Sequence, residues 1–284
     1  MFDPERAAIA GPMGAGTSLQ RTVGLAKVGF AQSDRGRTEL TDLHQAGAAK
    51  VRLPKVHTGA HAEAVLINTS GGLTDGDRLD TIVSIGPGAD AVVTTQACER
   101  IYRAASPSPA IIDTSITVGA GATFAWLPQE TILFDGGYVD RTNKVDLSGD
   151  AAFIGVESVI LGRLSMGETV STGSFRDRWQ IRRDGKLIFA DGFALSGDIA
   201  AQIDRPALLA GNRYISTILY AAADAETHLE AVRSAVEGSG AASAFDDKLI
   251  VRLICGDGRQ LRQALEAALA VLRSNRPLPR VWHI

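Results

Sequence analysis

Four acidic side chains stand in apolar or glycine-rich stretches, where a solvated carboxylate would not be expected. They are Asp77, Glu130, Glu157 and Glu168. Burying a lone carboxylate is costly unless it is paired or binds a cation. Each would be structural if it met one of the many arginines, whereas a run of such groups along an interior path would pass a divalent cation. Both interpretations stay open, and the four residues are the first candidates for a metal route.

Two histidines give a weaker metal signal. His57 and His61 are four residues apart between Pro54 and Glu63. On a helix this spacing would place both imidazoles on one face, but Gly59 and the preceding proline favour a loop. The pair is therefore either two solvated loop histidines or a two-histidine metal site with Glu63 close by.

The segment Gly71–Asp77 (GGLTDGD) is a glycine-rich turn with three interpretations. A phosphate loop requires a helix directly after the glycines, but here a strand follows and Gly-Lys-Ser/Thr does not occur. A calcium loop needs oxygen ligands at alternate positions. Asp75, Asp77 and Asp80 fit in part, but the closing glutamate of an EF-hand is missing. The third interpretation is a wide turn in which the glycines provide positive φ angles.

Composition and motifs narrow the class of protein. The chain has 284 residues and a net charge of −3, too near neutral to suggest a nucleic-acid groove. Its two cysteines, Cys98 and Cys255, allow neither a zinc motif nor a disulfide framework, which favours the cytosol. The sequence contains no apolar run of membrane-spanning length. It also lacks a nucleophile elbow, a His-Glu-x-x-His motif and a dinucleotide fingerprint, so no enzyme class is indicated.

The elements that must position these residues are mostly strands. Within Ala64–Arg103, three apolar runs alternate with Gly/Asp and Gly/Pro turns, which predicts consecutive antiparallel hairpins. Ala152–Leu161 is predicted to be a buried strand that holds Glu157. Leu19–Ser196 as a whole contains many short strands separated by glycine turns, a pattern typical of an all-β sandwich, barrel or solenoid.

A long hairpin closes this β-rich part. Its strands are predicted at Val170–Arg183 and Lys186–Leu195, around the favoured two-residue turn Asp184-Gly185.

The C-terminal third changes in character. Gly211–Ala221 and Lys248–Cys255 are predicted strands, and Asp224–Glu237 shows helical spacing with its first residue placed as the cap. The clearest helix begins after Asp257, an N-cap with a glutamine three residues later, and ends before Pro277. Alternating strands and helices indicate a small α/β layer packed on the β body.

These elements predict one domain over residues 18–284, after a disordered leader at 1–17. Its β body reaches to about residue 196, and the smaller α/β layer covers 211–284. The tail Pro277–Ile284 is expected to be extended because of its prolines. It carries Trp282, and aromatic residues are enriched as interface anchors. The tail therefore either forms part of a partner surface or folds back on its own domain.

The chain resembles the urease accessory protein D (UreD/UreH) family in a series of short motifs. They are, in order, GGLTDGDRL at 71–79, GPGA at 86–89, TTQA at 94–97, WLPQETILF at 126–134, LGR at 161–163, GE at 167–168 and PRVW at 279–282. Each motif is weak alone, but their order and spacing are specific and cover most of the chain from about Leu19. One departure is visible: the family often has two prolines before the double glycine, where this chain has Thr69 and Ser70.

The resemblance implies a mainly β fold: many short strands in a helical, solenoid-like β body, with about two α-helices near the C-terminus. It implies a cytoplasmic, non-enzymatic chaperone of urease maturation. The partners implied are the F accessory protein, the G-type GTPase and the urease apoprotein, with no nucleic acid or membrane. The protein would act as a scaffold and conduit in nickel insertion, with no tightly bound cofactor and only transient Ni²⁺. Carboxylates suit such rapid exchange better than a closed thiolate cage.

Two other functions are compatible with the residues. A β-solenoid carboxylate enzyme, such as a polysaccharide hydrolase, would use Asp77 and Glu157 as acid and base. A purely structural docking module would never contact the metal.

Overall fold

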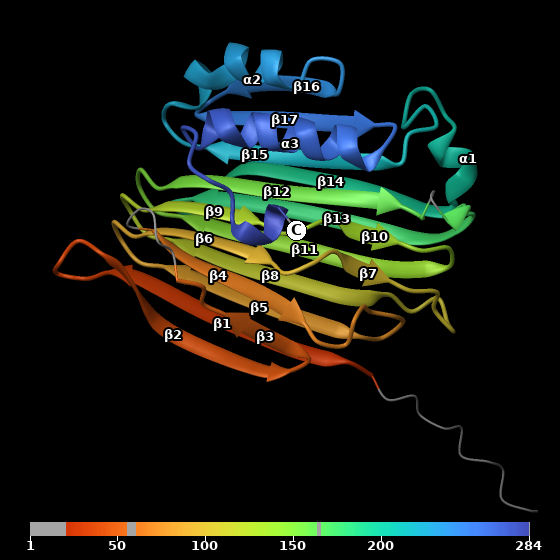
Figure 1. The fold of residues 1–284 in the computed structure, drawn as a ribbon, viewed down its shortest axis with the longest axis horizontal. Helices are drawn as coiled ribbons and strands as arrows, with labels where there is room; N and C mark the ends of the chain where they lie inside the picture. The colour runs from red at the N-terminus through yellow and green to blue at the C-terminus, as the bar shows by residue number, and fades with distance from the viewer. Residues whose placement is uncertain (1–20, 56–60, 164–165, 284) are drawn as a thin grey trace, which may run out of the picture.

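The computed structural model describes residues 21–55, 61–163 and 166–283. Two β-sheets face each other, and helices cover the outer face of one of them (Figure 1). Sheet A contains β1 (Val23–Gln32), β2 (Thr38–Gly47), β5 (Arg78–Ile85), β8 (Ala110–Val118), β11 (Gly137–Leu147), β13 (Thr172–Arg183) and β14 (Lys186–Asp198). Sheet B contains β3 (Ala49–Arg52), β4 (Ala62–Asn68), β6 (Asp90–Thr95), β7 (Glu99–Ile101), β9 (Thr123–Leu127), β10 (Thr131–Leu133), β12 (Ala152–Leu161), β15 (Tyr214–Ala221), β16 (Gly240–Phe245) and β17 (Lys248–Cys255).

The chain winds between the two sheets, so the mainly β, solenoid-like fold is confirmed. After β4 in sheet B the chain forms β5 in sheet A and returns to sheet B as β6. β4 and β6 therefore pair in parallel, as do β5 and β8 on the opposite side. The prediction of consecutive antiparallel hairpins within Ala64–Arg103 is wrong. The strands lie where the pattern placed them, but each glycine turn carries the chain across to the other sheet.

The hairpin of β13 and β14 is confirmed as antiparallel. Asp184 and Gly185 have φ angles of 49° and 78°. Positive φ at both central residues gives the turn the twist of the flanking strands.

Two apolar clusters fill the space between the sheets, one near each end. The first is built around Phe124, Phe153 and Trp179, and the second around Leu133 and Phe175. Inward side chains alternate with outward ones along each strand, so each strand contributes every second residue to these clusters.

A third apolar cluster lies on the outer face of sheet B, under α2 (Leu229–Ala235) and α3 (Gly258–Leu272). β15, β17 and β16 continue sheet B itself, so the α/β part shares its sheet with the β body. Asp257 caps α3 as predicted, because its carboxylate accepts a bond from the Gln260 N–H at 2.8 Å. A third, short helix, α1 (Ile199–Ile203), adds to the two expected. No helix in the described ranges is long and apolar enough to cross a membrane.

The predicted cap at Asp224 is not made. The segment after it starts as a 3₁₀ turn, and the Asp224 side chain makes no cap hydrogen bond. Its carboxylate accepts a bond from the Tyr220 hydroxyl at 2.6 Å instead. A competing side-chain donor thus takes the oxygen that a cap would need.

The C-terminal tail folds back on its own domain. Arg280–His283 form a 3₁₀ turn rather than an extended end. The Trp282 ring is buried, and its Nε1–H points to Thr94 Oγ1 at 3.1 Å and the Leu127 carbonyl at 3.2 Å. The side chain is therefore part of the core. The predicted leader lies outside the described residues.

Replacing Trp282 with alanine should destabilise the whole domain. The change removes a buried aromatic ring and leaves a cavity, which costs about 3–5 kcal/mol of unfolding free energy. Urea unfolding would measure this loss. His283→Ala is the matched control, because that neighbouring side chain is exposed and should change stability by less than about 0.5 kcal/mol. Equal stability of both variants would contradict the burial of Trp282.

Candidate functional site

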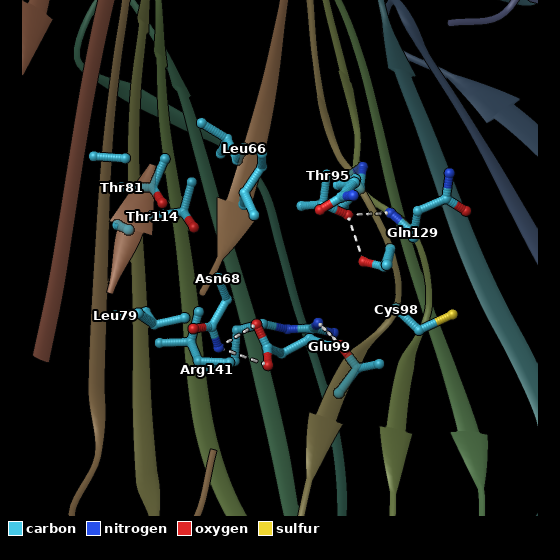
Figure 2. A pocket seen from close by; sticks show the side chains of 18 of the residues that line it. Leu66, Asn68, Leu79, Thr81, Thr95, Cys98, Glu99, Thr114, Gln129 and Arg141 are labelled. Carbon is cyan, nitrogen blue, oxygen red and sulfur yellow. Dashed lines mark hydrogen bonds between the residues drawn. The ribbon is translucent and has the colours of Figure 1, made fainter. Parts of the chain in front are cut away.

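Two neighbouring strand positions of sheet B are each interrupted by a short non-strand segment. β6 ends at Thr95 and β7 starts at Glu99, while β9 ends at Leu127 and β10 starts at Thr131. The next strand, β12, runs past this break without interruption. Between the sheets at this level lies a cavity of about 200 Å³ (Figure 2), whose wall includes both interrupting segments. The break thus borders an interior space.

A buried ion-pair triad joins the two sheets beside this cavity. Arg141 on β11 binds Glu157 of β12 through Nη1 and Oε2 at 2.6 Å. It also binds Asp177 of β13 through Nε and Oδ1 at 3.0 Å. Trp126 donates its Nε1–H to the other Glu157 oxygen at 3.3 Å. Burial raises the pKa of Glu157, and the nearby Arg141 opposes this shift.

Two further polar groups line the cavity. Asn143 is fully buried and donates its amide to Asp177 at 3.2 Å. Its Oδ1 has no hydrogen-bond partner among the described residues. Asn143 lines the cavity, so the wall contains one buried acceptor oxygen without a donor. Glu99 accepts two bonds from the Asn68 amide at 3.0 and 3.2 Å. Burial raises the pKa of Glu99 to about 7. The cavity wall therefore contains oxygen atoms that could serve as metal ligands, the kind of ligand that suits a hard or borderline cation.

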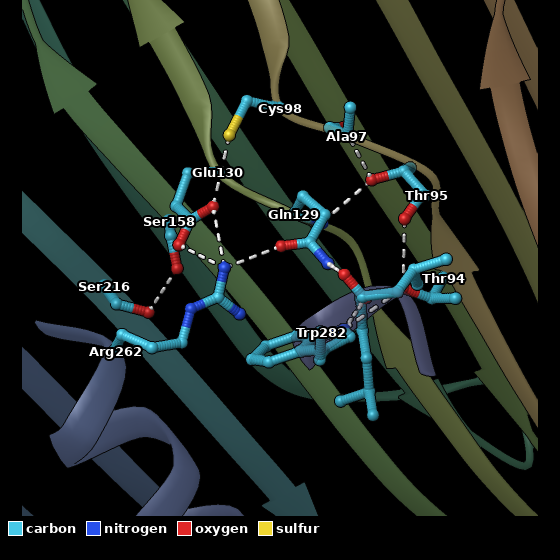
Figure 3. Close-up of polar contacts among 12 residues, drawn as sticks. Thr94, Thr95, Ala97, Cys98, Gln129, Glu130, Ser158, Ser216, Arg262 and Trp282 are labelled. Atoms are coloured by element: carbon cyan, nitrogen blue, oxygen red, sulfur yellow. Dashed lines mark hydrogen bonds and ion pairs between the residues drawn. The ribbon is translucent and has the colours of Figure 1, made fainter. Parts of the chain in front are cut away.

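A second polar cluster lies on the α3 side of the break (Figure 3). Glu130 forms an ion pair with Arg262 of α3 at 3.0 Å and accepts a bond from the Cys98 thiol at 3.3 Å. Arg262 also donates to Gln129 at 2.8 Å and lies 4.6 Å from the Trp282 ring centre. Burial raises the pKa of the Cys98 thiol to about 12, and the Glu130 charge adds to this effect. The thiol is therefore protonated at neutral pH.

Asp77 lies in the glycine-rich turn and stabilises the backbone there. Its carboxylate is buried and accepts bonds from the N–H groups of Thr22 at 2.7 Å and Thr74 at 2.8 Å. Gly72 and Gly76 have φ angles of 151° and 75°, as the wide-turn interpretation requires. Asp77 is not part of the cavity wall described above.

Glu168 is placed in a separate surface loop. It accepts bonds from Arg163 Nε at 2.9 Å and from the Asp135 N–H at 3.3 Å. The structure therefore brings Glu130 and Glu157 to the break in sheet B, whereas Asp77 and Glu168 lie in other loops.

His61 lines a second cavity of about 190 Å³ together with Asp90, Arg273 and Arg276. Burial lowers the pKa of His61, so the neutral imidazole is favoured. His57 lies outside the described residues. Within those residues, no group of three or more His, Cys, Asp or Glu side chains is arranged to hold a metal ion.

Sequence reasoning missed Glu99, Arg141, Asn143 and Asp177. A signal was present in β11, where Val139 and Val145 face the core and the residues between them on the same face are Arg141 and Asn143. Polar residues at inward positions of a strand indicate an interior polar site.

The raised pKa of Glu99 predicts a pH dependence of stability. Unfolded Glu99 loses its proton near pH 4.5, whereas the folded protein holds it to about pH 7. The unfolding free energy therefore falls as pH rises between these values. Glu99→Gln should make this fall shallower in urea titrations at several pH values. Glu39→Gln, at an exposed position on β2, should leave the slope unchanged, and equal slopes in all three proteins would refute the prediction.

Comparisons with known proteins agree on one family. The family model described as UreD urease accessory protein matches residues 23–283. A urease accessory protein UreD from Rhizobium leguminosarum bv. viciae is 51% identical over 271 residues, 95% of this chain and 98% of the relative. The protein of the same name from Agrobacterium fabrum is 43% identical over 265 residues, 93% of this chain and 92% of the relative. The chain therefore belongs to the UreD urease accessory protein family.

Proposed function

We propose that this protein is a non-enzymatic maturation factor that helps to insert nickel into urease in the cytoplasm. It would join the F accessory protein and the accessory GTPase to the urease apoprotein and provide part of the nickel route. Family membership supports the role in urease maturation. The observation that carries the nickel part is the cavity beside the break in sheet B, lined by Glu99, Glu157 and Asn143.

The donors on the cavity wall suit a cargo that must be released. Carboxylate and amide oxygens exchange a divalent ion faster than a closed thiolate cage does. Burial raises the pKa of Glu99 to about 7, so its protonated and charged forms coexist near neutral pH. An entering Ni²⁺ would displace the Glu99 proton, and its departure would restore it.

The proposed path crosses sheet B at the break. Glu130 pairs with α3 on the outer face, and Glu157 pairs with sheet A on the inner face. A cation that passes between residues 96–98 and 128–130 would meet first one carboxylate and then the other. Asp77, Glu168, His57 and His61 are weaker candidates for more distant parts of the route.

The placement of Asp77 disfavours the alternative of a β-solenoid hydrolase. A hydrolase needs two carboxylates across one substrate bond. Both oxygens of Asp77 instead accept backbone N–H groups in a different turn, away from the cavity that Glu157 lines. The remaining alternative is a docking module that never contacts metal, and equilibrium dialysis with Ni²⁺ separates it from a conduit.

The conduit proposal predicts slower urease activation when a cavity carboxylate is neutralised. Glu157→Gln and Glu99→Gln keep the shape of the side chain but remove its charge. Each should reduce the activation rate at limiting nickel about tenfold or more in a reconstituted system. Capture of the F protein and the GTPase should stay at the wild-type level. Glu39→Gln, far from the cavity on β2, is the matched control. Normal activation by both cavity variants would refute the conduit, while the scaffold role would stand.

The proposal also assigns all GTP hydrolysis to the GTPase partner. The glycine-rich turn is followed by β5, a strand, and not by a helix whose N-terminus could hold a phosphate. The purified chain should therefore show no GTP turnover above a mock preparation in a phosphate-release assay. Turnover that co-purifies with the chain through several columns would refute this part.

A further inference from the structure

The second cavity, of about 190 Å³, lies on the outer face of sheet B beside the C-terminal end of α3. One side of it is a row of directly opposed residues on four neighbouring strands: Val92 of β6, Ala125 of β9, Ile154 of β12 and Tyr220 of β15. All four also belong to the apolar cluster under the helices. The cavity therefore has an apolar side against which the hydrocarbon part of a ligand could pack.

Two arginines bring positive charge to the same cavity. Arg273 directly follows the last residue of α3, and Arg276 comes three residues later. Between them Ser274 and Asn275 have φ angles of 50° and 59°, so the chain turns back after the helix and both arginines line the cavity. Arg276 is already paired, because its Nη1 lies 2.5 Å from Asp90 Oδ2. Among the described residues of the lining, one aspartate thus balances one of the two arginines.

The charge of Arg273 is buried and has no ion-pair partner in the described part of the chain. The residue is only 7% exposed. Its two hydrogen bonds to described residues both leave from Nη1, and they reach the carbonyls of Arg276 at 3.2 Å and Pro277 at 2.9 Å. These bonds hold the turn after α3 but bring no negative charge. Burial lowers the pKa of Arg273, and the nearby Arg276 adds to this effect. A buried charge of this kind is stabilised by a counter-ion.

The unused donors of Arg273 suit a carboxylate. Its Nε–H and Nη2–H groups have no acceptor among the described residues. On one edge of a guanidinium these two groups lie parallel in one plane, and together they can bind both oxygens of a carboxylate. Glu63 is the nearby competitor, because it lies opposite Val92 on β4. Burial raises the pKa of Glu63 and the Arg273 charge opposes this shift, yet the two form no ion pair in the structure.

We propose that this cavity binds a small organic carboxylate, whose two oxygens pair with the free edge of Arg273 and whose hydrocarbon part packs against the apolar side. An apolar cavity of about 150 Å³ is large enough to hold benzene. The ligand is therefore an acid with a single ring or a short chain. The site shares no lining residue with the cavity at the break in sheet B, so the inference does not depend on the proposed nickel route.

Titration calorimetry of the full chain with simple probes tests the ligand class. Benzoate should bind, and benzamide, which has the same shape without the charge, should bind about tenfold more weakly or less. Acetate and inorganic phosphate should also bind more weakly than benzoate, because they gain nothing from the apolar side. Equal binding of benzoate and benzamide, tighter binding of phosphate, or no binding of either acetate or benzoate overturns the inference. No partner or nickel is present, so the proposed function stands or falls separately.

Substitutions with opposite effects locate the site. Arg273→Gln should weaken benzoate binding about tenfold or more, whereas Glu63→Gln removes the competing charge and should strengthen it about threefold. Arg259→Gln is the matched control, because Arg259 is exposed on the same helix and the change removes the same charge. It should leave the affinity unchanged.

A further variant covers the case in which Arg273→Gln does not fold, since that change also removes the bonds to the turn after α3. Arg273→Lys keeps the charge but lacks the two parallel N–H groups, and it should likewise weaken benzoate binding. Wild-type affinity in every Arg273 variant that folds overturns the inference. Weaker binding in Glu63→Gln, or an equal loss in Arg259→Gln, overturns it as well.

Discussion

The charge of Arg141 determines how the middle of the molecule is built. Its guanidinium lies between two sheets and is only 6% exposed, so it must be compensated where it stands. Asp177 does so from the directly opposed position on the neighbouring strand, and Glu157 from the facing sheet. This polar centre separates the two apolar clusters of the interior. The cavity lies at the same level, and Arg141, Asn143 and Glu157 form part of its wall.

Sheet B is broken at the same level as this polar centre. If the parallel strands ran on without interruption, their backbone hydrogen-bond ladder would close sheet B over the cavity. Residues 96–98 and 128–130 leave that ladder. Gln129 and Glu130 bond outward to Arg262 of α3, and Gln129 also donates to the Val281 carbonyl of the tail. Cys98 donates to Glu130 and so joins the two segments. β12 continues past the break and holds the two halves of the sheet together. An interior polar site thus coexists with a stable sheet, because one strand spans the place where its neighbours are interrupted.

Local pattern predicted the strands well and their partners poorly. The bounds of β12 and β17 follow from the pattern of apolar and turn residues, and they match the structure to the residue. The same alternation is compatible with a hairpin or with a crossing to the other sheet, so parallel pairing could not be deduced from it. The burial of Glu157 followed from the apolar strand around it. Its partner did not, because Arg141 lies on another strand in the facing sheet and no local signal joins the two.

The position of Trp282 has a consequence for how the sheet is held at the break. Its Nε1–H donates to Thr94, 188 residues earlier in the sequence, and to the carbonyl of Leu127, the last residue of β9. One side chain thus bonds to both strands just before they are interrupted. Any loosening of the tail would therefore also uncover the surface around Thr94 and Leu127 on the outer side of the break.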